Sequence, residues 1–353
     1  MSNAAANASD MPLPFDAATL ESYLAMHIES FQGPISITRF KGGQSNPTYL
    51  LEIPGHRYVL RAKPGPRSKL LPSAHAIERE FRVQSALAGS GVPVARMYCL
   101  CEDESIIGCA FYVMDHVDGR IFWDMSIPGA EPSERAALYD ELNRVISALH
   151  RVDPIAVGLS DYGKAGNYFA RQIERWTQQY GASRTVAIDA MDRLIEWLPA
   201  HIPADDDSVS LVHGDYRIDN VIFHPTEPRI LAVIDWELST LGHPMADFAY
   251  HMMSWYVRPG VLSGLAGLDL ATLGIPSVAA YTHAYERCVG RTMRGDWNFY
   301  LAYNLFRIAA ILQGIAKRVQ TGTASNARAV EYGRQAGPLA ELGWTFAQKV
   351  ASS

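Results

Sequence analysis

Three polar side chains stand at the edges of apolar, strand-like segments in LVHGDYRIDNVIFHPTEPRILAVIDWE, residues 211–237. Asp215 and Asn220 are five residues apart, and Asp235 follows fifteen residues later, directly after the run ILAVI. A buried carboxylate is costly unless it is paired or bound to a metal. The oxygens of Asn220 and Asp235 suit Mg²⁺, which leaves Asp215 to accept a proton. Phosphoryl transfer needs these parts, namely metal on the phosphates and an acid that orients the attacking hydroxyl.

The order and spacing of these residues match the catalytic and metal loops of the protein-kinase fold. The sequence has H-G-D-Y-R-I-D-N and then D-W-E where protein kinases have H-R-D and D-F-G. Taken separately, each motif could equally be a turn or a strand end. A zinc site of His213, His224 and Asp235 is a weaker interpretation, because no pair has the spacing of a known His-rich site. We predict that Asp215 is catalytic and that Asn220 and Asp235 are metal ligands.

A glycine-containing turn lies between two strand-like runs near the N-terminus, in FKGGQSNPTY. Glycine lets the backbone approach a ligand closely, and backbone N–H groups or a serine can bind phosphate oxygens. We therefore expect Gly43, Ser45 and Asn46 to contact the nucleotide. A plain hairpin turn is the alternative.

The next strand-like run, YVLRAK, carries two candidate cations for the α- and β-phosphates. Arg61 follows the apolar residues directly and is preferred, and Lys63 is the second candidate. Glu80, within a predicted helix over residues 74–90, is expected to pair with that cation. The alternative for Glu80 is a solvated helix face.

The segment FYVMDHVDG reads as a strand that ends at a glycine. In a kinase-like lobe the backbone of Asp115 and Val117 could bond an adenine edge, with Met114 behind the base. Ordinary core packing of Met114 is equally consistent.

The distribution of patterns along the chain predicts a smaller β-rich lobe followed by a larger, mostly helical lobe. We expect a disordered tail over residues 1–14, a small β-rich N-lobe over 15–118, and a larger, mainly helical C-lobe over 119–353. The C-lobe is expected to carry one β-hairpin, formed by the segment from LVHGD onward and by RILAVID, which the turn HPTEP joins. Helical periodicity returns over residues 245–256, 277–290, 296–320 and 326–350.

Composition narrows the function classes. The 353 residues are 48% hydrophobic and carry a formal net charge of −6, which does not favour nucleic-acid binding. The start, MSNAAANASDMPLP, lacks the features of a signal peptide, and no segment reads as membrane-spanning. A cytoplasmic location is expected, and the four cysteines read as small buried hydrophobes.

Taken together, G-G-Q-S-N, E-R-E-F, Y-V-M-D-H-V-D-G, H-G-D-Y-R-I-D-N and D-W-E-L-S-T-L-G-H-P-M-A-D-F-A-Y resemble the aminoglycoside phosphotransferase and choline kinase-like superfamily. In detail they look most like the phosphotransferase domains associated with acyl-CoA dehydrogenases. The resemblance implies an α+β, bilobal protein-kinase-like fold, with ATP or GTP as donor and Mg²⁺ as cofactor. It also implies that Asp215 is the base, that Asn220 and Asp235 bind the metal, and that Asp247 braces the catalytic loop.

Two residues depart from the kinase pattern. Arg61 stands where many kinases have Lys, although a guanidinium can hold phosphates in a bidentate way. Glu237 replaces the glycine of D-F-G, and either adds a carboxylate near the metals or faces solvent.

The acceptor is expected to be a small molecule with a hydroxyl group. From residue 258 onward the chain has ten Lys and Arg against five Asp and Glu, a formal charge of +5. That balance disfavours a polycationic aminoglycoside and favours an anionic acceptor, of which a hydroxyacyl-CoA is one kind, unless the charges are only scattered over the surface. An antibiotic kinase and a silent nucleotide-binding pseudokinase are the alternatives. Arg217 is predicted to stabilise the transferred phosphoryl group, or else to order the loop by pairing with Asp219 or Asp215.

Overall fold

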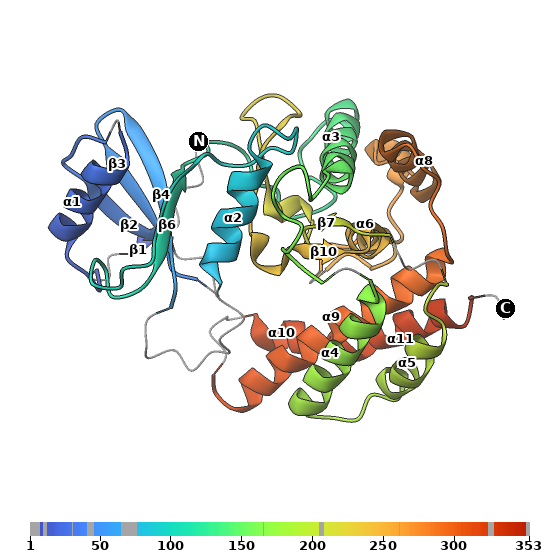
Figure 1. Ribbon diagram of the computed structural model, residues 1–353. Coiled ribbons are helices and arrows are strands. Elements are labelled where there is room, and N and C mark those ends of the chain that lie inside the picture. Colours follow the sequence, from blue (N-terminus) through green and yellow to red (C-terminus); the bar gives the residue numbers. More distant parts are fainter. Residues whose placement is uncertain are drawn as a thin grey trace. The chain divides into compact units, whose positions relative to one another are not determined.

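The computed structural model describes residues 8–9, 13–29, 31–40, 46–64, 76–164, 166–204, 208–260, 262–323 and 328–350 (Figure 1). The chain divides into two compact units. The first comprises Met1–Ile121, Val157–Leu159 and Asn220–Ser239, and the second comprises Phe122–Ala156, Ser160–Asp219 and Thr240–Ser353.

The first unit contains an antiparallel sheet of six strands in the order β1-β2-β3-β4-β6-β5. Its strands are β1 (Ala8–Ser9), β2 (Ser36–Phe40), β3 (Thr48–Ile53), β4 (His56–Ala62), β5 (Met97–Cys101) and β6 (Phe111–Asp115). Side chains alternate between the two faces of a strand. Phe111 and Val113 therefore join the core on one face, whereas Tyr112 and Met114 lie on the other.

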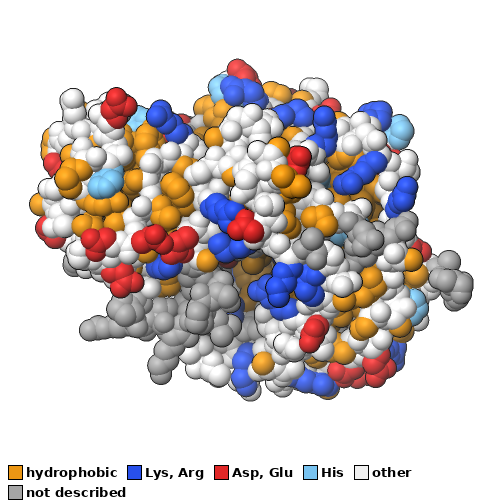
Figure 2. Space-filling view, in the orientation of Figure 1, with side chains coloured by type: hydrophobic (Ala, Val, Ile, Leu, Met, Phe, Trp, Pro, Cys, Tyr) orange, Lys and Arg blue, Asp and Glu red, His pale blue; other side chains and the backbone are white. Residues whose placement is uncertain are grey.

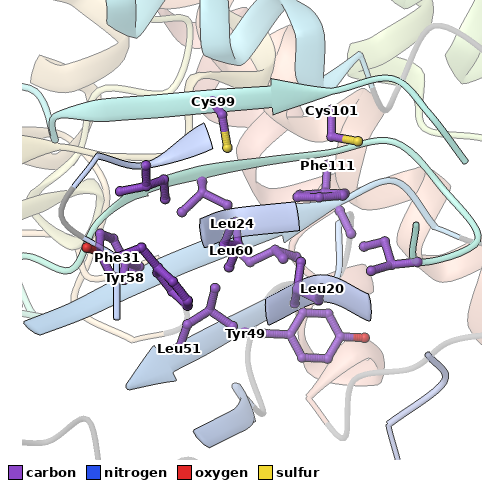
Figure 3. Packing of buried hydrophobic residues seen from close by; sticks show 14 residues of the cluster. Leu20, Leu24, Phe31, Tyr49, Leu51, Tyr58, Leu60, Cys99, Cys101 and Phe111 are labelled. Atoms are coloured by element: carbon purple, nitrogen blue, oxygen red, sulfur yellow. The ribbon is translucent and has the colours of Figure 1, made fainter. Parts of the chain in front are cut away.

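One helix covers each face of this sheet. Helix α1 (Ala17–His27) packs Leu20 and Leu24 against Leu51 and Leu60 of the central strands (Figure 3). Helix α2 (Ile77–Leu87) packs on the opposite face, where its Ile77 joins Ala110 and Tyr112.

The expected tail over residues 1–14 differs from the structure where that segment is described. Ala8–Ser9 forms β1 and pairs with the end of β2. Leu13 packs against the same core cluster as α1. Apolar burial at Leu13 draws the chain onto the sheet before α1 begins.

The first unit also holds a short hairpin from much later in the chain, β8 (Val221–Phe223) and β9 (Ile230–Val233). Backbone hydrogen bonds tie it to residues near the sheet, from Val233 N to Pro93 O at 2.9 Å and from Arg120 N to Phe223 O at 2.8 Å. This division differs from the expected boundary at residue 118/119, because these bonds join residues 220–239 to the β-rich unit.

The second unit is mainly helical. Its elements are α3 (Pro132–Arg151), α4 (Tyr168–Ser183), α5 (Asp189–Ala200), β7 (Ser210–Val212), β10 (Thr240–Gly242), α6 (Pro244–Met252), α7 (Leu270–Leu273), α8 (Val278–Val289), α9 (Trp297–Gln320), α10 (Ala329–Gly333) and α11 (Ala336–Ala347). Helix α9 packs against α4, α6, α10 and α11 and forms the centre of this unit.

One sequence expectation for this region is corrected in part. The segment from LVHGD onward holds two strands rather than one: β7 pairs with β10, whereas β8 pairs with β9 across the expected turn HPTEP. The helical periodicity expected over 326–350 is confirmed in the described residues by two helices, since α10 ends at Gly333 and α11 begins at Ala336. A Cβ on Gly333 would lie 2.9 Å from the Cβ of Ala316, so glycine permits the close approach of α10 to α9.

Helix α9 is the one described helix whose length and composition would allow it to cross a membrane. The sequence-based expectation that no segment qualifies is therefore too strict. However, 83% of its most apolar window is buried inside the protein, as in the core helix of a globular unit.

Candidate active site

An ion pair in the first unit joins two predicted nucleotide-site residues. Arg61 lies on β4 and Glu80 on α2, and Arg61 Nε is 2.9 Å from Glu80 Oε2. Only 13% of the Arg61 side chain and 2% of the Glu80 side chain are exposed. Lys63, the alternative cation, contacts Glu78 instead. The structure therefore makes Arg61, and not Lys63, the partner of Glu80.

Two hydrogen bonds fix the carboxylate of Glu80. Asn46 Nδ2 donates to Oε1 and Tyr112 Oη donates to Oε2, both at 3.0 Å. Asn46, which we predict to contact the nucleotide, is therefore a partner of Glu80 in this structure. Gly43 and Ser45, predicted to bind phosphate, lie outside the described residues.

The same guanidinium reaches two further carboxylates. Arg61 Nη2 is 3.1 Å from Asp235 Oδ1 and 3.5 Å from Glu237 Oε2. Desolvation lowers the pKa of Arg61, but the carboxylate of Glu80 and those of Asp235 and Glu237 raise it further, so that the net shift is upward. Burial raises the pKa of Glu80 despite the opposing effect of Arg61. Glu237, the departure from D-F-G, thus faces the cation that is predicted to hold phosphates.

The β8–β9 hairpin brings the two predicted metal ligands to one end. Asn220 precedes β8 and Asp235 follows β9, Val221 pairs with Val233, and Ile234 N donates to Asn220 O at 2.9 Å. Since the strands are antiparallel, the residue before one strand and the residue after the other lie at the same end of the hairpin.

This donor set fits Mg²⁺. An amide oxygen and a carboxylate oxygen are hard ligands, and Mg²⁺ takes its remaining ligands from water and phosphates. Among the described residues, no group of three or more His, Cys, Asp or Glu side chains is placed to hold a metal ion. The zinc interpretation with His213 and His224 therefore has no support in the described part of the chain.

The predicted adenine-contacting residues lie at the end of β6. Met114 is partly buried against the cluster of Ile77, Ala110 and Tyr112, as core packing would require. The Asp115 side chain accepts a hydrogen bond from Tyr98 Oη at 2.6 Å, and its backbone N–H donates to Arg96 O at 2.8 Å. Val117 is partly exposed. Their contact with adenine stays a prediction.

In the second unit, α6 supports the predicted catalytic loop. Asp247 Oδ2 accepts from His213 N and Asp247 Oδ1 accepts from Gly214 N, both at 2.8 Å. His150 Nε2 lies 3.2 Å from the same carboxylate. Burial raises the pKa of Asp247, but His150 and the His213 backbone lower it to a net downward shift, so the group stays ionised. This is the bracing geometry that the resemblance implies for Asp247.

The predicted base, Asp215, follows this braced turn. Arg217 Nε lies 3.4 Å from Asp215 Oδ1 as an ionic contact, and Arg217 Nη2 donates to Asp219 Oδ2 at 2.7 Å. Both pairings of the loop-ordering alternative are thus present. The Arg217 side chain is nevertheless 38% exposed.

Sequence reasoning missed two residues in this loop's surroundings. Tyr250, on α6, donates a hydrogen bond from Oη to Asp215 Oδ1. Arg307, on α9, donates from Nη2 to Gly214 O at 2.5 Å, and its guanidinium carbon lies 4.9 Å from the centre of the Tyr250 ring. A weak signal existed for Tyr250, because it lies three residues after Asp247 and so on the same face of the helix.

The second unit also contains a cavity of about 650 Å³. The residues around it are Ser208, His243, Pro244, Met245, Tyr285, Val289, Arg291, Thr292, Met293 and Arg294. None of the predicted catalytic or metal-binding residues lines it.

Known proteins are similar to this chain in sequence. Residues 36–288 match the family described as "Phosphotransferase enzyme family". Acyl-CoA dehydrogenase family member 10 of Mus musculus is 48% identical over 342 residues, and family member 11 of Gallus gallus is 43% identical over 349 residues, each match covering 96% of this chain. The chain spans 32% and 44% of the length of these two relatives.

Solved structures are also similar to this chain. A Ralstonia eutropha protein, named provisionally as an aminoglycoside phosphotransferase, is 60% identical with a TM-score of 0.90, and the match covers 96% of this chain and all of that one. Aminoglycoside phosphotransferase APH(4)-Ia, solved with AMP-PNP and hygromycin B, has a TM-score of 0.59 at 16% identity over 94% of this chain and 99% of its own, which shows the fold alone. The kinase-like fold and the resemblance are confirmed, and the chain belongs to the phosphotransferase enzyme family.

Proposed function

We propose that this chain transfers the γ-phosphoryl group of ATP or GTP to a hydroxyl group of a small anionic molecule of the hydroxyacyl-CoA class. The observation that carries the proposal is that Glu80 and Asp235 both contact the guanidinium of Arg61. A buried cation held by one glutamate and facing the predicted metal ligand is the arrangement that kinases use to bind nucleotide phosphates.

On the nucleotide side, Arg61 would bind the α- and β-phosphates in place of the usual lysine. Glu80 keeps the guanidinium in place through the 2.9 Å ion pair. Asn220 and Asp235 would hold Mg²⁺, which when bound neutralises phosphate charge. Arg61 would exchange its contact with Asp235 for contacts with phosphate, which would leave Asp235 available as a metal ligand.

On the acceptor side, Asp215 would orient the attacking hydroxyl and take its proton. A general base must lie within hydrogen-bonding reach of that proton, so its carboxylate has to be held in position. Asp247 holds the preceding backbone of His213 and Gly214. Arg217 would stabilise the charge that grows on the transferred group, as a preorganised donor does.

Two observations support an anionic acceptor over a polycationic one. Arg217 lies beside Asp215, and residues from 258 onward carry a formal charge of +5. Figure 2 shows Lys and Arg side chains scattered over the visible face of the molecule. The charge balance therefore supports a class of acceptor rather than a particular pocket. The relatives named as acyl-CoA dehydrogenase family members favour acyl-CoA-type molecules.

A ³¹P NMR screen with Mg²⁺ and either ATP or GTP tests the proposal. The acceptors are 3-hydroxyacyl-CoAs, amino alcohols, sugars and aminoglycosides. We expect a new phosphomonoester signal with a hydroxyacyl-CoA, its loss in Asp215→Ala, and its retention in Asp192→Asn, which removes only an exposed ion pair with Arg184. Phosphorylation of aminoglycosides alone, or no transfer to any acceptor, would contradict the proposal.

A further inference from the structure

Helix α6 contacts the catalytic loop through two side chains one turn apart. Asp247 accepts the backbone N–H groups of His213 and Gly214, and Tyr250 donates its hydroxyl to Asp215 Oδ1. Residues three apart on a helix share a face. One rigid element therefore holds both the backbone before the predicted base and the carboxylate itself.

A carboxylate needs such a contact if it is to act as a base in a fixed geometry. The last torsion of an aspartate side chain is broad, so backbone bracing alone does not set the positions of the two oxygens. The donor is reliably protonated, because burial and the neighbouring Asp215 raise the pKa of Tyr250. Only 4% of Tyr250 is exposed, so water does not compete well for this hydrogen bond.

Arg307 in turn holds Tyr250. Its guanidinium carbon lies 4.9 Å from the centre of the Tyr250 ring and 5.6 Å from that of Trp176, and its Nη2 donates to Gly214 O at 2.5 Å. A cation over an aromatic face is attracted to the ring. The positive charge also opposes the rise in the pKa of Tyr250, which makes its hydroxyl a stronger donor.

We propose that Tyr250 is a positioning residue that sets the rotation of the Asp215 carboxylate, and that Arg307 locks Tyr250 in place. This inference rests on the proposed phosphotransferase function. Neither residue touches the reacting atoms, so both act through Asp215. Loss of either should slow transfer without weakening the binding of nucleotide, whose predicted contacts all lie in the first unit.

The test compares steady-state kinetics of Tyr250→Phe, Arg307→Lys and the parent protein, using the best acceptor from the screen. We expect Tyr250→Phe to lower kcat by about tenfold to a hundredfold, since a small misplacement of a catalytic group costs rate of that order. The KM for nucleotide should stay within about twofold, as expected for an interaction that acts mainly in the transition state. Arg307→Lys should show the same split with a smaller effect.

Tyr139→Phe is the matched control. It also removes a buried tyrosine hydrogen bond in the second unit, from Tyr139 Oη to Met125 O, without contact to Asp215. It should lower the melting temperature and leave kcat unchanged. Parent-like kcat in Tyr250→Phe, or an equal fall of kcat in Tyr139→Phe, overturns the positioning role. A parent protein that transfers phosphate to no acceptor overturns the proposed function first, and this inference with it.

Discussion

Replacing Arg61 with Met tests the ionic arrangement of the first unit most directly. The substitution keeps much of the apolar stem and removes the cation that faces Glu80, Asp235 and Glu237. Removing one partner of a buried ion pair costs about 3–5 kcal/mol. Glu80 keeps two hydrogen bonds, and the Asp235 side chain is 37% exposed, so we expect the lower end of that range, about 3 kcal/mol at pH 7.5.

The destabilisation caused by Arg61→Met should be larger at high pH than at low pH. Burial already raises the pKa of Glu80, and loss of Arg61 removes a group that lowers it. A carboxyl group with a raised pKa in the folded state is most favourable below its ordinary value of 4.5, and it destabilises the fold as the pH rises through the raised value. The destabilisation by Arg61→Met should therefore shrink as the pH falls from about 7.5 to about 5.5.

Hydrogen–deuterium exchange of peptides that cover β4 and α2 is the suitable assay, because it reports local opening in a chain with two compact units. The double variant Arg61→Met/Glu80→Gln is the control, since it lacks the buried carboxyl group and should lose the pH dependence. Equal destabilisation by Arg61→Met at both pH values would refute the reasoning. So would a double variant that keeps the full pH dependence.

Four further predictions concern single residues. Asp215→Ala should abolish transfer while calorimetry shows nearly intact nucleotide binding; equal loss of both would contradict the role of Asp215 as the base. Asp235→Ala should remove the Mg²⁺ dependence of nucleotide affinity, and an unchanged Mg²⁺ titration would exclude it as a ligand. Arg217→Met should lower kcat at least tenfold, the effect of roughly 1.4 kcal/mol, with little change in melting temperature; lower melting temperature with near-normal kcat would leave only loop ordering. Burial lowers the pKa of His251 from 6.5 to about 4, so the free energy of unfolding should decrease as the pH falls from 6.5 to 4, by up to about 1.4 kcal/mol per pH unit. Urea titrations of His251→Gln should show a weaker dependence of this free energy on pH.

The parts that sequence predicted well are those fixed by short-range spacing. Asn220 and Asp235 flank two short apolar runs, and antiparallel pairing of β8 with β9 brings the flanks to one end of the hairpin. The pairing of β7 with β10 was not predicted, for a related reason. A strand of three buried residues carries no information about its partner, and β10 lies beyond the whole hairpin in sequence. Such pairings depend on contacts across the fold rather than on local pattern.

The supports of the base show where a sequence pattern stops being informative. The spacing M-A-D-F-A-Y places Asp247 and Tyr250 on one helical face, so a sequence can indicate that they act together. It cannot indicate their target, because Tyr250 is 35 residues from Asp215 and Arg307 is 93 residues from Gly214. Motif matching therefore finds the residues that are predicted to meet substrate, whose spacing follows from one loop. The residues that hold those groups come from α6 and α9, and only packing of these helices selects them.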